Sequence, residues 1–437
     1  MKNRLFEIWF SLCVGAANTE FQSLLDRFGT PYDVFNAEDA ELERLSLSPR
    51  LEQALLNKSL QESMRIEQYC KQNGIGILFW QDEDYPAALR SLRDPPVLLY
   101  YRGRLPDINN RLCISVVGTR KMSEYGKRMA YKIGYELAAA GTVIVSGMAL
   151  GNDSVATVGA ICAGGSTVAV LGSGVDVVYP PEHTALYEEI IRTGAVISEY
   201  PPGSPPLGSH FPVRNRLISG LSQGTLVVEA DHVSGALITA KTAILQGRDI
   251  YALPANIGEV NSEGTNRLIS EGAGVVLKAK DILENYAFIY RDVLNMKRLS
   301  NAELLSDLDG EMLARFGVRG RKVRSSKRTD STEKAPAPAP RPRRSAERSE
   351  TPATAKSKPA HAPTPAPKAE QSETRAVLDT LTGTQRRVFE AIPVDGTVTV
   401  EHLTGEGFSM SEIMASVTIL EIKGLIVTLP GGLMGRK

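Results

Sequence analysis

The sequence has few of the residues that build metal centres or disulfide frameworks. It contains four cysteines, which are far apart and form no CxxC pair, and only five scattered histidines. This spacing matches no metal-ligand pattern and favours a reduced protein with free thiols. We therefore expect no metal, no cofactor and a cytoplasmic location.

A net charge and long apolar runs are also missing. The 50 basic and 50 acidic side chains cancel, so any surface for nucleic acid must come from local clustering of charge. No stretch approaches the roughly 18 apolar residues of a membrane span. The first residues carry an acid after two basic residues, unlike a secretory signal. We expect no contact with a membrane.

The ends of the chain differ from its middle. Residues 1–75 repeat apolar side chains at helical spacing and predict a small helical domain, either a plain helical bundle or a domain of SAM-like or helix-hairpin-helix-like type. Residues 319–375 are rich in Pro, Ala, Lys, Arg and Ser and predict a disordered basic linker, which either adds affinity for nucleic acid or makes no contact. Residues 376–437 predict three helices and a hairpin, the order of a winged helix. Its acidic recognition-helix region favours protein docking or weak DNA contact.

The middle of the chain, residues 76–318, predicts an α/β domain. Prolines bracket apolar runs near 74–80 and 95–101, which indicates an ordered connector carrying a strand. Further on, β-branched runs alternate with helical stretches of about a dozen residues. This alternation predicts a Rossmann-like, doubly wound, mostly parallel sheet with helices on both faces. The runs lie at 112–117, 142–145, 167–171, 195–198, 225–229, 249–253 and 274–277.

Small and basic residues follow several of these strands. Ligands of such sheets bind at the carboxyl ends of the strands, where glycine lets a phosphate approach backbone N–H groups. Each turn alone is a weak signal, but together they favour a shared phosphate-binding edge. No complete dinucleotide or Walker motif is present. The candidates are Gly118, Thr119 and Arg120, then Ser146, Gly147 and Gly151, the turn at 172–174, and finally Ser234, Gly235, Thr239 and Lys241.

The segment 211–222 combines an aromatic ring with two arginines at the predicted start of a helix. Phe211 offers a face on which a base could stack, and Pro212 is suited to open the helix. Arg214 and Arg216, with Asn215 between them, suit phosphate oxygens. Spacing alone leaves a second interpretation open, an ordinary amphipathic helix with solvated arginines.

No residue set of a nucleophilic enzyme is apparent. Glu199 and Glu229 end strands and could act as catalytic carboxylates, although a capping or structural role is the better expectation. We therefore expect no catalytic residues.

Read together, these motifs resemble the DprA/Smf family, the DNA-processing proteins of natural transformation. The resemblance covers about residues 80–280 in order and spacing. It is carried by Tyr85-Pro86, Pro95-Pro96, Gly103, Val117–Arg120, Ser146–Asp153, Thr167–Gly174, Tyr179-Pro180, Ser198–Gly203, Phe211–Ser222, Val228–Ala230, Ser234–Ala240, Gly247-Arg248 and Gly264–Asn266.

The resemblance implies a protein that binds single-stranded DNA without sequence preference, forms a homodimer through the Rossmann-like domain and loads RecA. It implies that Gly118, Thr119 and Arg120 hold a phosphate and that Ser146, Gly147 and Gly151 help line the pocket. In that family Phe211 would stack on a base, while Arg214–Arg216 position the backbone and the helix start. The family is not known as an enzyme.

Two departures and two alternatives accompany this resemblance. The family's Gly-Ile-Asp-x-x-Ala-His is Gly151–Thr157 here, with Asn152 and Thr157 changed, and its Pro-Gly near 254 is Pro254-Ala255. A nucleotide-processing enzyme of the phosphoribohydrolase-like class is the main alternative, but its Pro-Gly-Gly-x-Gly-Thr loop is absent from residues 76–318. A purely protein-binding adaptor conflicts with the arginines and glycines at the strand ends.

Overall fold

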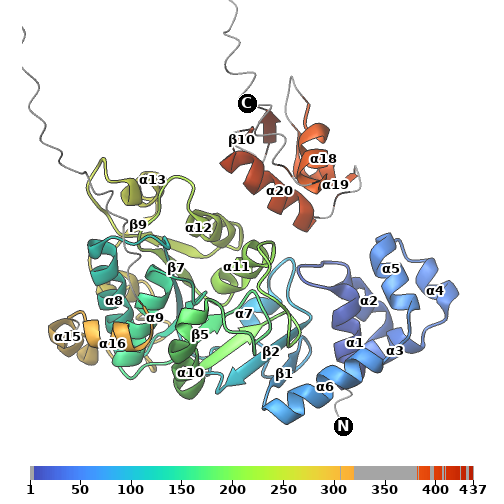
Figure 1. Ribbon diagram of the computed structural model, residues 1–437, viewed down its shortest axis with the longest axis horizontal. Helices are drawn as coiled ribbons and strands as arrows, with labels where there is room; N and C mark the ends of the chain where they lie inside the picture. Colours follow the sequence, from blue (N-terminus) through green and yellow to red (C-terminus); the bar gives the residue numbers. More distant parts are fainter. Residues whose placement is uncertain are drawn as a thin grey trace, which may run out of the picture. The chain divides into compact units, whose positions relative to one another are not determined.

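Figure 1 presents the computed structural model of the chain. It describes residues 4–305, 307–318, 381, 383–393, 398–405, 408, 410–423, 425–429 and 433–436. The predicted linker at 319–375 lies outside the described residues.

Six helices occupy the first part of the chain. Their apolar faces enclose a core of aromatic and aliphatic side chains that includes Trp9, Phe10 and Phe21. Local signals set the boundaries: Thr30 caps one helix by accepting the Asp33 N–H, and Pro31 occupies its first position. The helices are α1 (Arg4–Val14), α2 (Phe21–Phe28), α3 (Pro31–Asn36), α4 (Asp39–Glu43), α5 (Pro49–Leu56) and α6 (Gln61–Asn73).

A nine-stranded sheet forms the centre of the next part, with the order β1-β2-β6-β5-β4-β3-β7-β8-β9. The strands from β3 onward pair in parallel, while β2 pairs antiparallel with both β1 and β6. The strands are β1 (Gly76–Phe79), β2 (Leu98–Gly103), β3 (Cys113–Val117), β4 (Val143–Ser146), β5 (Thr167–Val170), β6 (Ala195–Ser198), β7 (Gly224–Val227), β8 (Asp249–Ala252) and β9 (Gly274–Val275).

Helices cover both faces of this sheet (Figure 1). Because side chains alternate along a strand, β3 sends Ile114 and Val116 into one core and Cys113 and Val117 into the other. The first core is shared with α8 (Glu124–Ala139), α9 (Asn152–Cys162), α10 (Thr184–Thr193), α14 (Ala279–Leu283), α15 (Met296–Leu305) and α16 (Gly310–Arg315). The second is shared with α7 (Ala87–Arg90), α11 (His210–Gly220), α12 (Gly235–Leu245) and α13 (Glu263–Ser270).

The predicted parallel sheet is confirmed, and every strand expected between residues 112 and 277 is present. Two details differ from the expectation. The runs treated as a connector, β1 and β2, extend the sheet itself, because β2 pairs along β6. Helix α11 begins at His210, so Pro212 is its third residue and not its first. Position three also tolerates proline, since its N–H would have no intrahelical partner there.

The described C-terminal residues form three helices and a hairpin. The elements are α18 (Gly383–Ala391), α19 (Val400–Gly405), α20 (Met410–Ile422), β10 (Ile426–Leu429) and β11 (Leu433–Arg436). The two strands pair antiparallel, and Val398 forms a bridge with Met434. Assignment of this unit as a winged helix stays a prediction. None of the described helices is long and apolar enough to cross a bilayer.

Candidate nucleic-acid interface

The loops that follow β3, β4 and β5 lie beside the start of α11. These strands are adjacent and parallel, so their carboxyl ends share one edge of the sheet. Strand order reverses at β3, which has β4 on one side and β7 on the other. Such an edge is where open α/β sheets bind ligands.

Arg120 and Phe211 are the accessible pair of this edge. The guanidinium carbon of Arg120 lies 5.8 Å from the centre of the half-buried Phe211 ring, and its side chain is exposed. Among the described residues, Arg120 has no carboxylate partner. An exposed and unpaired guanidinium next to an aromatic ring is suited to a phosphate and an adjoining base.

Asp153 ties the first two glycine loops together. Its carboxylate oxygens accept the N–H groups of Gly118 (3.2 Å) and Gly147 (3.1 Å). Burial raises the pKa of Asp153, and the nearby positive charge of Arg214 opposes that effect. The two amides expected to face a phosphate therefore hold a carboxylate of the chain itself. The available signal for this role was an acidic residue two positions after Gly151, at the start of a helix, and sequence reasoning did not use it.

Arg214 is a buried component of the same edge. Only 4% of the residue is exposed. Its guanidinium donates hydrogen bonds to the carbonyl oxygens of Gly147 (3.0 Å) and Val170. Burial lowers the pKa of Arg214, and the charge of Asp153 opposes that change. Arg214 thus joins the ends of β4 and β5 to α11, and three of its hydrogen bonds have acceptors within the protein.

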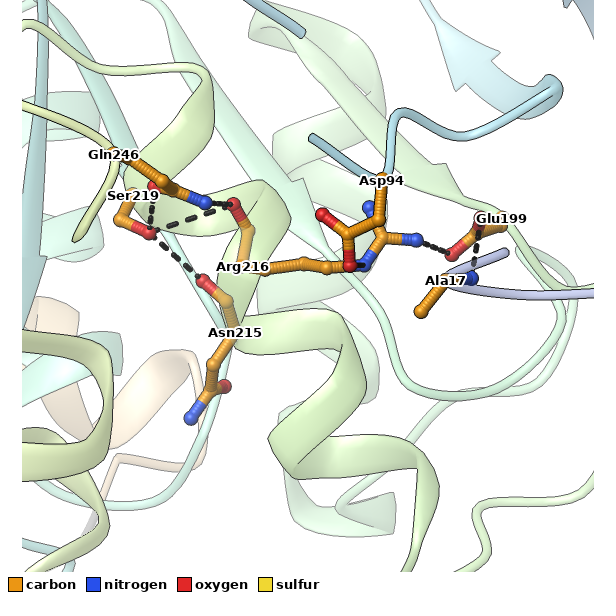
Figure 2. A network of polar contacts seen from close by, with 7 residues as sticks. All are labelled: Ala17, Asp94, Glu199, Asn215, Arg216, Ser219 and Gln246. Carbon is orange, nitrogen blue, oxygen red and sulfur yellow. Dashed lines mark hydrogen bonds and ion pairs between the residues drawn. The ribbon is translucent and has the colours of Figure 1, made fainter. Parts of the chain in front are cut away.

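Arg216 lies in a different buried network, drawn in Figure 2. Its guanidinium pairs with Glu199 at 2.5 Å and with Asp94 at 3.3 Å. Glu199 also accepts the N–H of Ala17 at 3.4 Å, which connects the first helices to the end of β6. Burial raises the pKa of Glu199, and Arg216 offsets part of that shift. Neither arginine of α11 is solvated, so the ordinary amphipathic helix does not describe this segment.

Gln246 adds a further connection to α11. Its amide donates to the Arg216 carbonyl at 2.9 Å, and its oxygen accepts the Ser219 hydroxyl at 2.6 Å (Figure 2). These bonds fix the backbone of the helix that carries Phe211 and Asn215. Asn215 is half-buried, and its oxygen accepts the Arg214 Nε–H at 3.2 Å.

Three other predicted residues shape the loops of this edge. Thr119 donates its N–H to the Glu229 carbonyl at 2.8 Å, and Ser146 donates its hydroxyl to the Val116 carbonyl at 2.7 Å. Gly151 has a φ of +89°, and a Cβ there would lie 2.3 Å from the Thr119 carbonyl oxygen. Only glycine permits this approach of the two loops.

The remaining predicted residues lie on α12. Ser234 caps the helix by accepting the Ala236 N–H, and the buried Thr239 hydroxyl donates to the Gly235 carbonyl. Lys241 is exposed on the same helix. The side chains of Ser234 and Thr239 form their hydrogen bonds with backbone groups of α12. None of these bonds connects α12 to the loops around Arg120.

The two departures at α9 have local partners. Asn152 is buried and donates to Glu229 at 3.4 Å, while its side-chain oxygen has no partner among the described residues. Thr157 donates its hydroxyl to the Asp153 carbonyl at 2.9 Å. Both residues therefore support the helix that carries Asp153.

A separate cavity of about 690 Å³ lies at the ends of β3, β7 and β8. Ser123, Tyr125, Arg128, Asn256 and Asn261 are among its lining residues, with Glu229. The Glu229 carboxylate accepts the N–H and hydroxyl of Ser123, at 3.0 and 2.5 Å. Glu229 therefore has the structural role expected for it, because both oxygens hold the start of α8.

Fold and site define a doubly wound α/β protein whose polar edge joins an exposed arginine to an aromatic ring. Comparison with known proteins matches residues 76–287 to the family described as DNA recombination-mediator protein A. The chain belongs to this family.

Two relatives and one solved structure illustrate the similarity. The DNA processing protein DprA of Streptococcus pneumoniae is 42% identical over 207 residues, which cover 47% of this chain and 73% of that protein. Protein Smf of Synechocystis is 42% identical over 211 residues, 48% of this chain but only 53% of that protein. The X-ray structure of the S. pneumoniae protein aligns with a TM-score of 0.55 and 33% identity, over 65% of this chain and 98% of that one.

Proposed function

We propose that this protein binds single-stranded DNA without sequence preference at the edge formed by Arg120 and Phe211. One observation carries the proposal: an exposed arginine with no carboxylate partner among the described residues lies 5.8 Å from an accessible aromatic ring. A phosphate and a base are the two features every nucleotide shares, so such a pair binds any sequence. Gly118 and Thr119 shape the loop after β3 that carries Arg120. Gly147 and Gly151 shape the neighbouring loop after β4.

The arginines of α11 have a different part in this proposal. Arg214 and Arg216 are buried and bonded within the protein, so we assign them to the positioning of Phe211 and Asn215 and assign the phosphate contact to Arg120. The fixed edge lowers the entropy cost of binding, because the groups that meet DNA are held in place beforehand.

Membership of a recombination-mediator family supports a role in DNA processing. We propose that the bound strand is protected and passed to RecA during natural transformation, in the cytoplasm. The enzyme alternative draws on the cavity beside Glu229, but both oxygens of that carboxylate are already engaged. The alternative would be favoured if the purified protein bound single and double strands equally and cleaved nucleoside monophosphates.

We also propose the domain plan of residues 1–75, 76–318, 319–375 and 376–437, with the last as a winged helix. The order of three helices followed by a two-stranded hairpin supports this assignment.

A homodimer through the Rossmann-like domain is the proposed assembly. Large apolar side chains are exposed on α12, on edge strand β9 and in the segments that follow β8 and β9, and exposed apolar side chains of this size are typical of a protein interface. They are Ile244, Leu245, Ile257, Val260, Val275 and Leu277.

Arg120→Ala tests the proposed site. We expect affinity for a labelled oligo-dT to fall about tenfold or more, the loss typical of one charge-assisted contact. The salt dependence should also become shallower, by about 0.7 in the slope of log K against log salt. Fluorescence anisotropy over a salt series measures both, with duplex DNA of the same length for comparison.

Arg291→Ala is the control at a second arginine–aromatic pair, in which the arginine also has a carboxylate, Asp292, at 3.8 Å. Arg291 also lies beside an exposed aromatic ring, 6.0 Å from the centre of Phe288. That segment lies at the other end of the strands, where they begin. Asn295 in the same segment donates its N–H to the carbonyl oxygen of Ala140, which comes just before β4. Equal affinity of wild type and Arg120→Ala for single strands at low salt would overturn the proposed site.

A further inference from the structure

We propose that Tyr179 and Phe211 form a two-ring platform on which neighbouring bases of a single strand stack. This inference rests on the proposed function and adds a binding residue to its site. Tyr179 belongs to the loop between β5 and α10, whereas Phe211 lies in the first turn of α11. The tertiary structure alone brings the two rings together.

The geometry of the two rings suits a shared platform. Their centres are 5.4 Å apart and their planes are inclined by 35°. Tyr179 is 39% exposed, so part of this side chain is accessible to a ligand. Base stacking on aromatic side chains tolerates every sequence, because every base has a π-face.

Neighbouring residues hold the Phe211 ring of this platform in place. A Cβ at Gly172 would lie 3.0 Å from Phe211 Cδ1, so glycine there leaves room for the ring. The neighbouring His210 places Nδ1 at 3.0 Å from the Gly172 carbonyl oxygen and stacks on Tyr200 at 3.9 Å with a 12° inclination. A ring fixed in this way loses little freedom when a base stacks on it.

Arg120 completes the arrangement. Its guanidinium lies on the Phe211 side of the platform, 5.8 Å from that ring. A phosphate attached to the nucleotide on Phe211 is therefore within reach of Arg120, and the next base along the strand falls toward Tyr179. We therefore expect Tyr179 to contribute to DNA affinity by stacking on a base, and Arg120 to contribute by its attraction to a phosphate.

The first test compares Tyr179→Ala with Tyr179→Phe by anisotropy on oligo-dT. Removal of the ring should weaken binding about fivefold or more, in the range found for one stacked base, whereas the phenylalanine variant should bind like wild type. Phe288→Ala is the matched control, because that ring is 84% exposed, also has an arginine beside it and lies at the other end of the strands. Thermal melting checks that each variant is folded.

The second test separates stacking from mere support of Phe211. An oligonucleotide of the same length in which every base is replaced by an abasic linker keeps its phosphates but has no ring to stack. If Tyr179 stacks on a base, Tyr179→Ala should bind this strand like wild type, while Arg120→Ala should still bind it more weakly. Because the whole strand is abasic, the result does not depend on the binding register.

The outcomes separate this inference from the proposed function. Weaker binding by Arg120→Ala and Phe211→Ala, with unchanged binding by Tyr179→Ala, would overturn the platform and leave the site in place. If Tyr179→Ala loses as much affinity for the abasic strand as for oligo-dT, Tyr179 only supports Phe211. That result would also overturn the platform. Unchanged binding by all three variants would remove the proposed site itself.

Discussion

At the scale of single residues, burial decides which charged groups can meet a ligand. Arg120 and Arg214 both lie 5.8 Å from the Phe211 ring. Arg214 donates to two carbonyl oxygens within the protein, and Asp153 accepts from two glycine loops. Removing one member of such a buried set costs more than removing an exposed charge, because its partners remain buried and uncompensated. Arg120, being exposed, can be tested without this cost.

His183 is a buried histidine that contacts the loop after β4. Its Nδ1 lies 3.1 Å from the Met148 carbonyl oxygen, which requires that nitrogen to donate, and its buried Nε2 has no partner among the described residues. Burial lowers the pKa of His183 below 6.5, although the Met148 bond and the nearby Glu182 oppose this effect. The bond holds the loop after β4 against the segment that follows Tyr179.

The pH prediction follows from that lowered pKa. Between the lowered pKa of the folded state and the ordinary value of 6.5, the unfolded chain binds more protons at His183 than the folded chain does, so the free energy of unfolding should fall as pH decreases through this range. The slope contributed by this one group can reach about 1.4 kcal/mol per pH unit. Urea denaturation at pH 7.5, 6.5 and 5.5 measures it, and His183→Asn should show a flatter dependence. Parallel curves for the two proteins would contradict the assignment.

At the scale of elements, two glycines let α8 and α9 approach each other closely. A Cβ at Gly134 would lie 2.3 Å from the Ala156 carbonyl oxygen, and one at Gly159 would lie 2.3 Å from the Tyr131 carbonyl oxygen. The obstacles are backbone atoms, which cannot rotate away. This packing places the start of α9, with Asp153, against the loop after β3.

Gly159→Ala should therefore destabilise the protein by about 1–3 kcal/mol or more, as overpacking does in a core. Gly310→Ala is the matched control, because Gly310 is also a helical residue but has no atom within 4 Å of the added Cβ. That substitution should be neutral or slightly stabilising. Chemical denaturation compares the two variants, and equal midpoints would contradict the close approach.

At the scale of the whole molecule, exposed apolar side chains on α12 and at β9 support the proposed dimer. β9 is the edge strand of the nine-stranded sheet and has only two residues. Leu245, the last residue of α12, is 76% exposed, and Leu277 follows β9 with 68% exposed. A second copy of the chain would cover such side chains.

Leu245→Glu should shift the protein from dimer to monomer, because the interface would have to bury an unpaired carboxylate. Sedimentation velocity measures the mass directly. Met64→Glu provides the control, since Met64 is also an exposed apolar residue but lies on α6. A wild-type protein that is monomeric at micromolar concentration, or a Leu245→Glu variant that remains dimeric, would contradict this interface.

The sequence by itself determined the parallel sheet, its strands and the strand ends at which polar residues gather. Those features are local: β-branched runs, helical periodicity and glycine turns are encoded within short windows. It also identified Arg120 and Phe211 as candidates, because residue chemistry alone singles out an arginine after a strand and an aromatic at a helix start.

Tertiary structure alone decided which candidates are accessible. Arg214 and Arg216 look as available as Arg120 in the sequence, yet their partners come from segments 17 to 122 residues away, at Gly147, Glu199 and Asp94. The pairing of Tyr179 with Phe211, and of β2 with β6, likewise joins segments that no local pattern connects. Burial and long-range contact depend on how the layers pack, and this information is spread over the whole chain.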